Sequence, residues 1–290
     1  MPLEGIVKLG LDLCDPDALM ERLLSVSLLE ARYEPRWDVT EYQCAPLVTD
    51  WLDGQGLIDD DPRWLNAAAD YHLYLLAHER RTLAQAIAAH HALRRAKRDA
   101  EANRLTLDAI VGPLTLACFY TTLLTEWLPR ICSSPDLKTR GEALGQTGKL
   151  LHHLGNFENA LPYMKQSLAI CQQIGDLRGQ GTTLNNISAL YHAQGDYETA
   201  LTYLQQALAI CQQIGDKAGL CATLFNMGHI HAQNKQIQEA VNAWVTVYVI
   251  AKQINEHQAL QALSQLAPQL GLPEGLQGWE MLAERMKAEG

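Results

Sequence analysis

Apolar residues recur every three to four positions along most of the chain after residue 60, the spacing expected of amphipathic helices. Two consecutive segments show this most clearly, with apolar faces formed by Leu184, Ile187 and Tyr191 and then by Leu201, Leu204 and Leu208. The first 57 residues have a different pattern of apolar and polar positions. They predict an amphipathic helix over residues 15–33, a hairpin-like polar stretch, and a second helix over residues 42–54.

An internal repeat of 40 residues dominates the second half of the chain. Residues 155–176 and 195–216 are near copies, and residues 235–256 continue the series more weakly. The segments just before each copy also match one another, at 145–154, 185–194 and 225–234. Each unit is therefore predicted to be two helices joined by a turn, which Gly155 and Gly195 mark because glycine tolerates a left-handed helix end.

Small residues recur at two positions of the repeat where a pair of helices must approach closely. They are Gly148, Ser188 and Gly228 on the first helix, and Ala160, Ala200 and Ala240 on the second. Larger side chains there would push the two helices apart, so each unit is predicted to be a closely packed hairpin.

Residues 140–256 resemble the tetratricopeptide repeat, in the 40-residue form found in kinesin light chains and in bacterial signalling proteins. The resemblance implies an all-α fold, a right-handed superhelical solenoid of helical hairpins. The proline that follows the second helix of shorter repeats is missing here. The extra residues CQQIGD, at 171–176 and 211–216, are therefore expected to lengthen that helix.

The remaining segments divide the chain further. Residues 257–290 are predicted to be capping helices, with a closing helix over 276–286 that carries Trp279 on its apolar side. Residues 58–135 are predicted to be degenerate helical repeats, in which Gly112-Pro113 and Ser133-Ser134-Pro135 break a helix on both sides. The expected divisions are 1–57, 58–135, 136–256 and 257–290.

Residues 1–57 are similar to the end of the winged-helix domain of STAND-class signalling ATPases, in their "SLLE" segment at 27–30 and their "PLV..WL" segment at 46–52. In those proteins tetratricopeptide repeats follow. The resemblance implies either the sensor or autoinhibitory fragment of such an ATPase or a stand-alone descendant. A peptide-responsive transcription regulator is a third alternative, but residues 1–57 contain no basic recognition helix.

The composition narrows the choice of partner. The 290 residues are 48% hydrophobic and 19% charged, which excludes a disordered chain, and the net charge of −10 argues against nucleic acid or anionic lipid as a partner. Basic residues concentrate only over 80–104, where acidic residues interleave them. No segment predicts a membrane span, and seven cysteines without a C-x-x-C pair favour a cytoplasmic protein with free thiols.

No catalytic, metal or cofactor motif is complete. The segment GQTGKL at 145–150 resembles a phosphate loop but lacks the first glycine, the hydroxyl residue and the preceding strand. The histidine pairs at 90–91, 152–153 and 229/231 lack further ligands at metal spacing. We therefore expect a non-enzymatic protein without cofactors.

The first helices of the repeats carry the positive signal, because the resemblance places them on a concave, partner-binding face. The residues implied there are Gln146, Lys149, His152, His153, Asn185, Asn186, His192, Phe225, Asn226 and His229. Asn186 and Asn226 match the asparagine that holds the backbone of an extended peptide in related long-repeat proteins. Lys149 would then hold a carboxylate, and Phe225 with His192 would contact side chains, so the sequence predicts a protein- or peptide-binding module.

Overall fold

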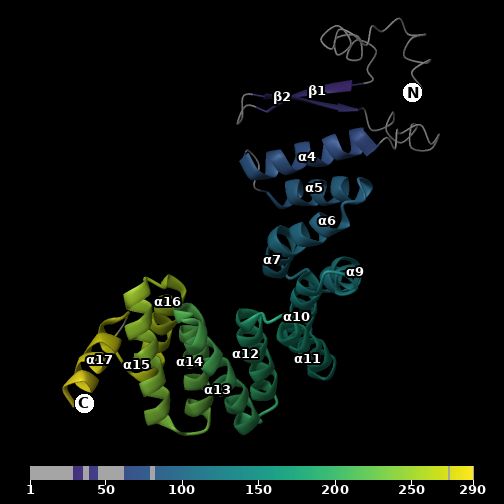
Figure 1. The fold of residues 1–290 in the computed structure, drawn as a ribbon. Coiled ribbons are helices and arrows are strands. Elements are labelled where there is room, and N and C mark those ends of the chain that lie inside the picture. Colours follow the sequence, from purple (N-terminus) through teal and green to yellow (C-terminus); the bar gives the residue numbers. More distant parts are fainter. Residues whose placement is uncertain (1–28, 35–38, 45–61, 79–81, 274, 290) are drawn as a thin grey trace, which may run out of the picture. The chain divides into compact units, whose positions relative to one another are not determined.

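The computed structural model describes residues 29–34, 39–44, 62–78, 82–273 and 275–289. The chain divides into two compact units, residues 1–105 and 106–290. Figure 1 labels helices and strands of both units. The division between them falls inside the segment predicted to be degenerate repeats. Each unit is described by itself below.

The described part of the first unit contains a β-hairpin and helices. Strands β1 (Leu29–Glu34) and β2 (Val39–Cys44) pair antiparallel, with Leu29 opposite Cys44 and Glu34 opposite Val39. Helices α4 (Pro62–His78), α5 (Leu83–Arg95) and α6 (Asp99–Leu105) follow. The turn between α5 and α6 contains Lys97 in the left-handed conformation, at φ 59°.

The hairpin corrects two helix predictions. Residues 29–33 and 42–44 were assigned to helices from their apolar spacing, but they lie in β1 and β2. The segment Val39–Cys44 contains β-branched and aromatic residues, which favour extended backbone when a partner strand lies beside them. The rest of the two predicted helices, and with them most of the winged-helix resemblance, lies outside the described residues.

The second unit begins with short, irregular helices. They are the π-helix η1 (Thr106–Ile110), α7 (Val111–Leu116), α8 (Tyr120–Thr122), the π-helix η2 (Leu123–Trp127) and α9 (Leu128–Cys132). Gly112 and Pro113 were expected to break a helix, but they lie in the first turn of α7. Helix α7 continues η1 without a gap, so the helical backbone passes through Pro113 and ends at Leu116. The π-helical turn directly before this proline interrupts the regular hydrogen-bond ladder, which is where a residue without an amide N–H can be accommodated. The break expected at 133–135 is confirmed, since α9 ends at Cys132.

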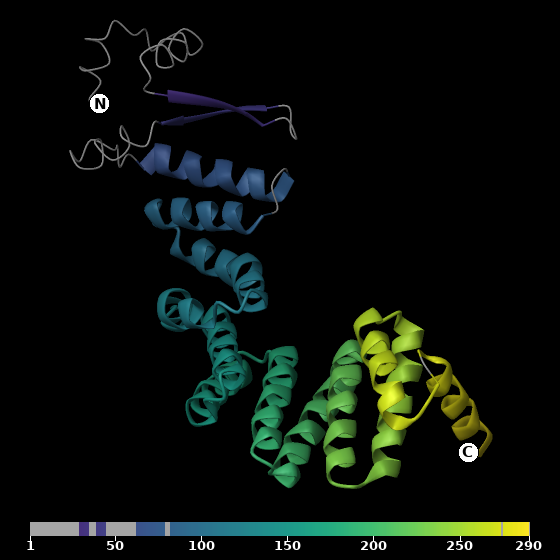
Figure 2. The same cartoon turned by 180° about the vertical axis from the view of Figure 1, so that it is seen from behind.

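The repeat region forms three helical hairpins. The pairs are α10 (Leu137–His153) with α11 (Phe157–Gln173), α12 (Leu177–Ala193) with α13 (Tyr197–Ile214), and α14 (Lys217–Gln233) with α15 (Ile237–Ile254). Consecutive helices pack against each other, and Figures 1 and 2 show α12–α15 side by side in sequence order. The predicted solenoid of paired helices is confirmed.

Close packing within each hairpin depends on the small residues singled out in the sequence. A Cβ added to Gly148 would lie 2.6 Å from Met164 Cγ. A Cβ added to Gly228 would lie 2.6 Å from Cε2 and 2.8 Å from Cδ1 of the Trp244 indole. All three distances are too short for non-bonded carbon atoms. The GQTGKL segment is accordingly part of α10, and its Gly148 is a packing residue.

The junction between successive hairpins is built in the same way twice. Gly175 and Gly215 adopt left-handed φ values of 71° and 68°, and the aspartates that follow them, Asp176 and Asp216, cap the next helix. Three residues further on, a Cβ added to Gly179 would lie 2.8 Å from Cys171 Sγ. A Cβ added to Gly219 would lie at the same distance, 2.8 Å, from Cys211 Sγ. The CQQIGD segment therefore lengthens the second helix, as expected, and then fixes the start of the next hairpin.

The last hairpin is covered by the predicted cap. Helix α16 (His257–Leu266) continues into a 3-10 turn, η3 (Ala267–Leu270), and α17 (Gln277–Glu289) packs on α15. Trp279 is fully buried, contacts Trp244 edge to face, and donates from Nε1 to the carbonyl of Leu263 at 2.8 Å. This aromatic pair closes the hydrophobic core at the end of the array.

Candidate functional site

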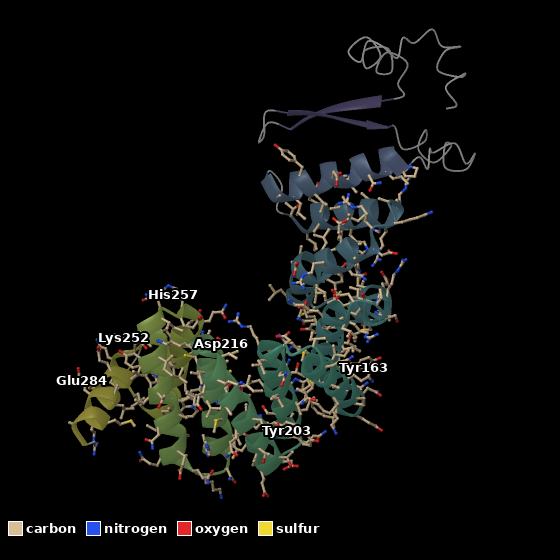
Figure 3. All side chains as sticks on the ribbon, viewed as in Figure 1. Tyr163, Tyr203, Asp216, Lys252, His257 and Glu284 are labelled. Atoms are coloured by element: carbon tan, nitrogen blue, oxygen red, sulfur yellow. The ribbon has the colours of Figure 1, made fainter. Side chains whose placement is uncertain are left out.

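The first helices of successive hairpins lie next to one another, α10 by α12 and α12 by α14, and together with α16 they form a surface that we call the first-helix face. Two hollows lie along it. The α12–α14 hollow encloses about 240 Å³ and the α14–α16 hollow about 300 Å³. Asp216 and His257 lie at the starts of α14 and α16, and Figure 3 shows both at the upper ends of the helices.

Both hollows are lined largely by small and amide side chains. The α12–α14 hollow is formed by Leu177, Arg178, Gly181, Thr182, Asn185, Asn186, Cys211, Ile214, Asp216, Gly219, Ala222 and Asn226. The α14–α16 hollow is formed by Ala218, Cys221, Ala222, Phe225, Asn226, Glu256, Gln258, Ala259 and Ala262. Ala222 and Asn226 belong to both lists, so the two hollows adjoin at Asn226.

Hydrogen bonds fix the amides between the two hollows. Asn185 Nδ2 donates to the Gly181 carbonyl at 3.0 Å and to Thr223 Oγ1 at 2.9 Å. Its carbonyl oxygen accepts from Asn226 Nδ2 at 3.3 Å. For Asn186 the structure gives no side-chain hydrogen bond to another described residue. Asn185 is therefore held in place by the fold, while Asn226 and Asn186 retain most of their bonding capacity.

Aromatic side chains extend the site along α14. The rings of Phe225 and His229 meet edge to face at 4.7 Å, and His229 meets Trp244 at 5.3 Å. Trp244 Nε1 donates to the Phe225 carbonyl at 3.2 Å, which ties the hollow to the buried core. Burial, and to a lesser extent His192, lowers the pKa of His229 and so favours its neutral imidazole.

The two hollows differ in charge. In the α12–α14 hollow, Asp216 caps α14 through the Gly219 amide and lies 3.4 Å from Arg178 Nε. In the α14–α16 hollow, Glu256 stands 40 residues after Asp216 but makes no side-chain cap. No hydrogen bond or ion pair joins its carboxylate to another described residue. Burial and the Glu256 charge raise the pKa of the Cys221 thiol to about 11, and both residues line this hollow.

The other residues predicted for the site lie outside the two hollows. Gln146 and Lys149 are exposed on α10. His152 is partly buried against Phe157, with its pKa lowered by burial and by His153 and His192, and His153 stacks on Tyr120. His192 pairs with Tyr197 and bonds Gln233 Oε1 at 2.8 Å. The histidines are thus arranged with aromatic rings along the first helices, and only Asn185, Asn186, Phe225 and Asn226 line the hollows.

Sequence reasoning missed the second wall of the α14–α16 hollow. Gln258, Ala259 and Ala262 come from the predicted cap, and Glu256 is the last residue of the predicted repeats. No site residue was predicted in either place. The 40-residue spacing from Asp216 to Glu256 was a signal that α16 continues the first-helix face. Ala222, which lines both hollows, occupies the repeat position of Thr182.

Other candidate chemistry finds no support in the described residues. Two of the basic residues near α5 and α6 pair with carboxylates: Arg94 pairs with Asp99, and Arg98 pairs with Glu101 at 2.7 Å and with Asp70 at 2.5 Å. These carboxylates raise the pKa of Arg98 and hold it charged. Within the described part of the chain, no three His, Cys, Asp or Glu side chains are grouped to hold a metal, and no helix is both long and apolar enough to cross a membrane.

Comparison with protein families finds two matches. Residues 139–213 match the tetratricopeptide repeat model, and residues 187–271 match the model of anaphase-promoting complex subunit 5. Together these segments cover α10–α16 and both hollows. No curated protein sequence matches the chain.

Solved structures with a similar fold share little sequence. Aspartyl phosphate phosphatase F from Bacillus subtilis is 14% identical, with 89% of this chain and 70% of that one covered and a TM-score of 0.55. BtubC (BKLC) from P. vanneervenii is 16% identical over 79% and 90% of the two chains, with a TM-score of 0.45. The STAND protein with a tetratricopeptide repeat sensor from Pyrococcus horikoshii is 15% identical over 99% and 54%, with a TM-score of 0.35.

Proposed function

We propose that this tetratricopeptide-repeat protein is a non-enzymatic module that binds an extended peptide segment of a partner protein along its first-helix face. The observation that carries the proposal is the position of Asn226, whose amide lies where two adjoining hollows meet. An extended chain laid across that point would offer its backbone to the amide and a side chain to each hollow.

The chemistry of an amide suits backbone recognition. Asn226 has two N–H donors and a carbonyl acceptor, and one contact, the 3.3 Å bond to Asn185, is made within the described residues. It can therefore donate to a peptide carbonyl and accept from a peptide N–H whatever the side chains are. Asn186, in the α12–α14 hollow, offers a second amide for the same purpose.

The size of the hollows favours side chains over a free small molecule. At about 240 and 300 Å³ they lie at or below the lower limit of typical small-molecule pockets. Their lining is preformed and rich in alanine and glycine, which leaves room for a partner without moving large side chains. Affinity would then come from several small sites along a chain.

The cellular setting is also a proposal. The five cysteines of the described region are all free thiols, and three of them, Cys171, Cys211 and Cys221, are buried. This is the usual state of cysteine in a reducing compartment and supports a cytoplasmic protein. No cofactor is needed for the proposed binding.

A selection with a phage-displayed library of random dodecapeptides tests the function. The best peptides are synthesised with a fluorescein label and titrated by fluorescence anisotropy against the wild type, Asn226→Ala and the control Asn242→Ala, which removes an amide from α15 outside both hollows. We expect Asn226→Ala to weaken binding about tenfold, the value of one or two lost hydrogen bonds, and Asn242→Ala to leave it unchanged. Failure to enrich any peptide, or equal affinity of the three proteins, would refute the proposal.

A further inference from the structure

The α14–α16 hollow contains a carboxylate that the fold does not use. At the corresponding position of three first helices, Asp136, Asp176 and Asp216 each accept a hydrogen bond from the amide three residues ahead. Glu256 takes that position before α16, and its longer side chain makes no cap. Glu256 is instead a partly buried residue in the wall of the hollow.

Two lysines, at the start of α14 and in the last turn of α15, have hydrogen-bond partners other than Glu256. Lys217, at the start of α14, donates to Gln253 Oε1 at 3.2 Å, and Lys252 donates to Glu280 Oε1 at 2.6 Å. His257 is exposed beside Glu256, and neither it nor any lysine or arginine lines the hollow. The partial positive charge of the α16 N-terminus is about half a unit, less than the full charge of the carboxylate. The hollow therefore presents net negative charge to a ligand.

The remaining walls match the stem of a long basic side chain. Ala218, Ala222, Ala259 and Ala262 form an apolar lining, and Phe225 adds an aromatic edge. Lysine and arginine bury their methylene stems on such surfaces while the charged head remains near water or a carboxylate. Gln258, on the same wall, supplies a second oxygen for the head group.

We propose that the α14–α16 hollow is a specificity pocket for a lysine or arginine side chain of the bound peptide, recognised by Glu256. The inference rests on the proposed peptide-binding function and adds the chemical class of the partner, a segment with a basic residue beside a small neutral one. The neutral neighbour belongs in the α12–α14 hollow, where Arg178 already balances Asp216. The chain's net charge of −10 attracts such a basic segment from a distance.

The test applies the same dodecapeptide library to the wild type, Glu256→Gln and the control Glu239→Gln, which makes the same change of charge at the start of α15. We expect a lysine or arginine to be fixed at one position of the peptides selected by the wild type and by Glu239→Gln, and not by Glu256→Gln. A wild-type-selected peptide should bind Glu256→Gln about tenfold more weakly, the value of a charge-assisted hydrogen bond, and Glu256→Lys should select an acidic residue instead. Circular dichroism confirms that each variant is folded.

The outcomes separate this inference from the function on which it rests. Selected peptides that lose affinity with Asn226→Ala but bind Glu256→Gln as tightly as the wild type would overturn the basic pocket and leave peptide binding intact. Selected peptides without a fixed basic residue would overturn it equally. If no peptide is enriched, both proposals fall.

Discussion

The fit between Gly228 and the indole of Trp244 predicts that a single methyl group at residue 228 destabilises the array. Alanine forms helix better than glycine by about 1 kcal/mol, so Gly228→Ala would stabilise α14 if space were available. The added Cβ would lie 2.6 Å from Cε2 of Trp244, however, and that ring is 1% exposed and hydrogen-bonded to Phe225. The indole cannot rotate away without losing this bond.

The magnitude follows from these opposing effects. Overpacking a core by one methyl group costs up to about 3 kcal/mol, and loss of the indole hydrogen bond costs about 1 kcal/mol. Since the gain in helix propensity offsets about 1 kcal/mol, we expect Gly228→Ala to lower the free energy of unfolding by about 3 kcal/mol. Urea unfolding followed by circular dichroism and tryptophan fluorescence measures this change, and the near-ultraviolet spectrum reports any shift of the indole.

Gly181 provides the matched control, because it is also a buried helical glycine in a first helix. A Cβ added there would lie 3.7 Å from Cys211 Sγ, an ordinary van der Waals contact. Gly181→Ala should therefore raise the stability by up to about 1 kcal/mol. If Gly228→Ala is as stable as Gly181→Ala, the close approach of α14 to α15 is not what the structure indicates, and the reasoning is refuted.

Three further predictions concern the cap residues, the end of the array and pH. Asp216→Ala should lower the free energy of unfolding by about 1 kcal/mol in urea titrations, since it removes the N-cap of α14. Trp279→Ala should lower the free energy of unfolding by about 3–5 kcal/mol, because Trp279 of α17 is fully buried. It should also make the amides of α17 the first to exchange in hydrogen-exchange experiments. Stability should fall as the pH drops below 6.5, because burial lowers the pKa of His229 in the folded chain and the unfolded chain then binds more protons. The urea midpoint measured between pH 7.5 and 5 checks this slope, which His229→Gln should reduce.

Each of these predictions has its own control. Asp216→Asn keeps a capping oxygen and should retain most of the stability, so an equal loss in both variants would contradict the capping role. Met281→Ala changes an exposed residue of α17 and should be nearly neutral, whereas equal losses for Met281→Ala and Trp279→Ala would count against the cap. A pH slope that is unchanged in His229→Gln would show that another group titrates.

The regular part of the fold could be predicted because local and long-range signals agree there. Three signals together predict where each hairpin of α10–α15 begins and ends: the 40-residue period, the turn glycines and the small residues. Lys235 even keeps the left-handed conformation of the glycine that it replaces, at φ 62°. The short helices before α10 could not be predicted in the same way. Their π-helical turns and the placement of Pro113 in α7 depend on tertiary packing and leave no periodic pattern.

The candidate site was predicted only in part, for a related reason. Asn186 and Asn226 align in the repeat, but Asn226 donates to Asn185, 41 positions away, and this hydrogen bond depends on how α12 meets α14. The histidines lie in the predicted helices, but their rings contact aromatic neighbours: His152 contacts Phe157, and His192 contacts Tyr197. Sequence spacing placed these residues in the first helices, where the structure has them, whereas the hollows depend on which side chains are small across two helices.

The repeated junction makes the 40-residue unit exchangeable. A left-handed glycine, a capping aspartate and a glycine packed on a cysteine occur in the same order at 171–179 and 211–219. The two junctions between hairpins therefore have the same local structure. Unequal recombination between these two stretches of the coding sequence would add or delete a whole hairpin without a strained joint. The near identity of residues 155–176 and 195–216 is what such a duplication leaves behind, and each added copy would lengthen the first-helix face by one more helix.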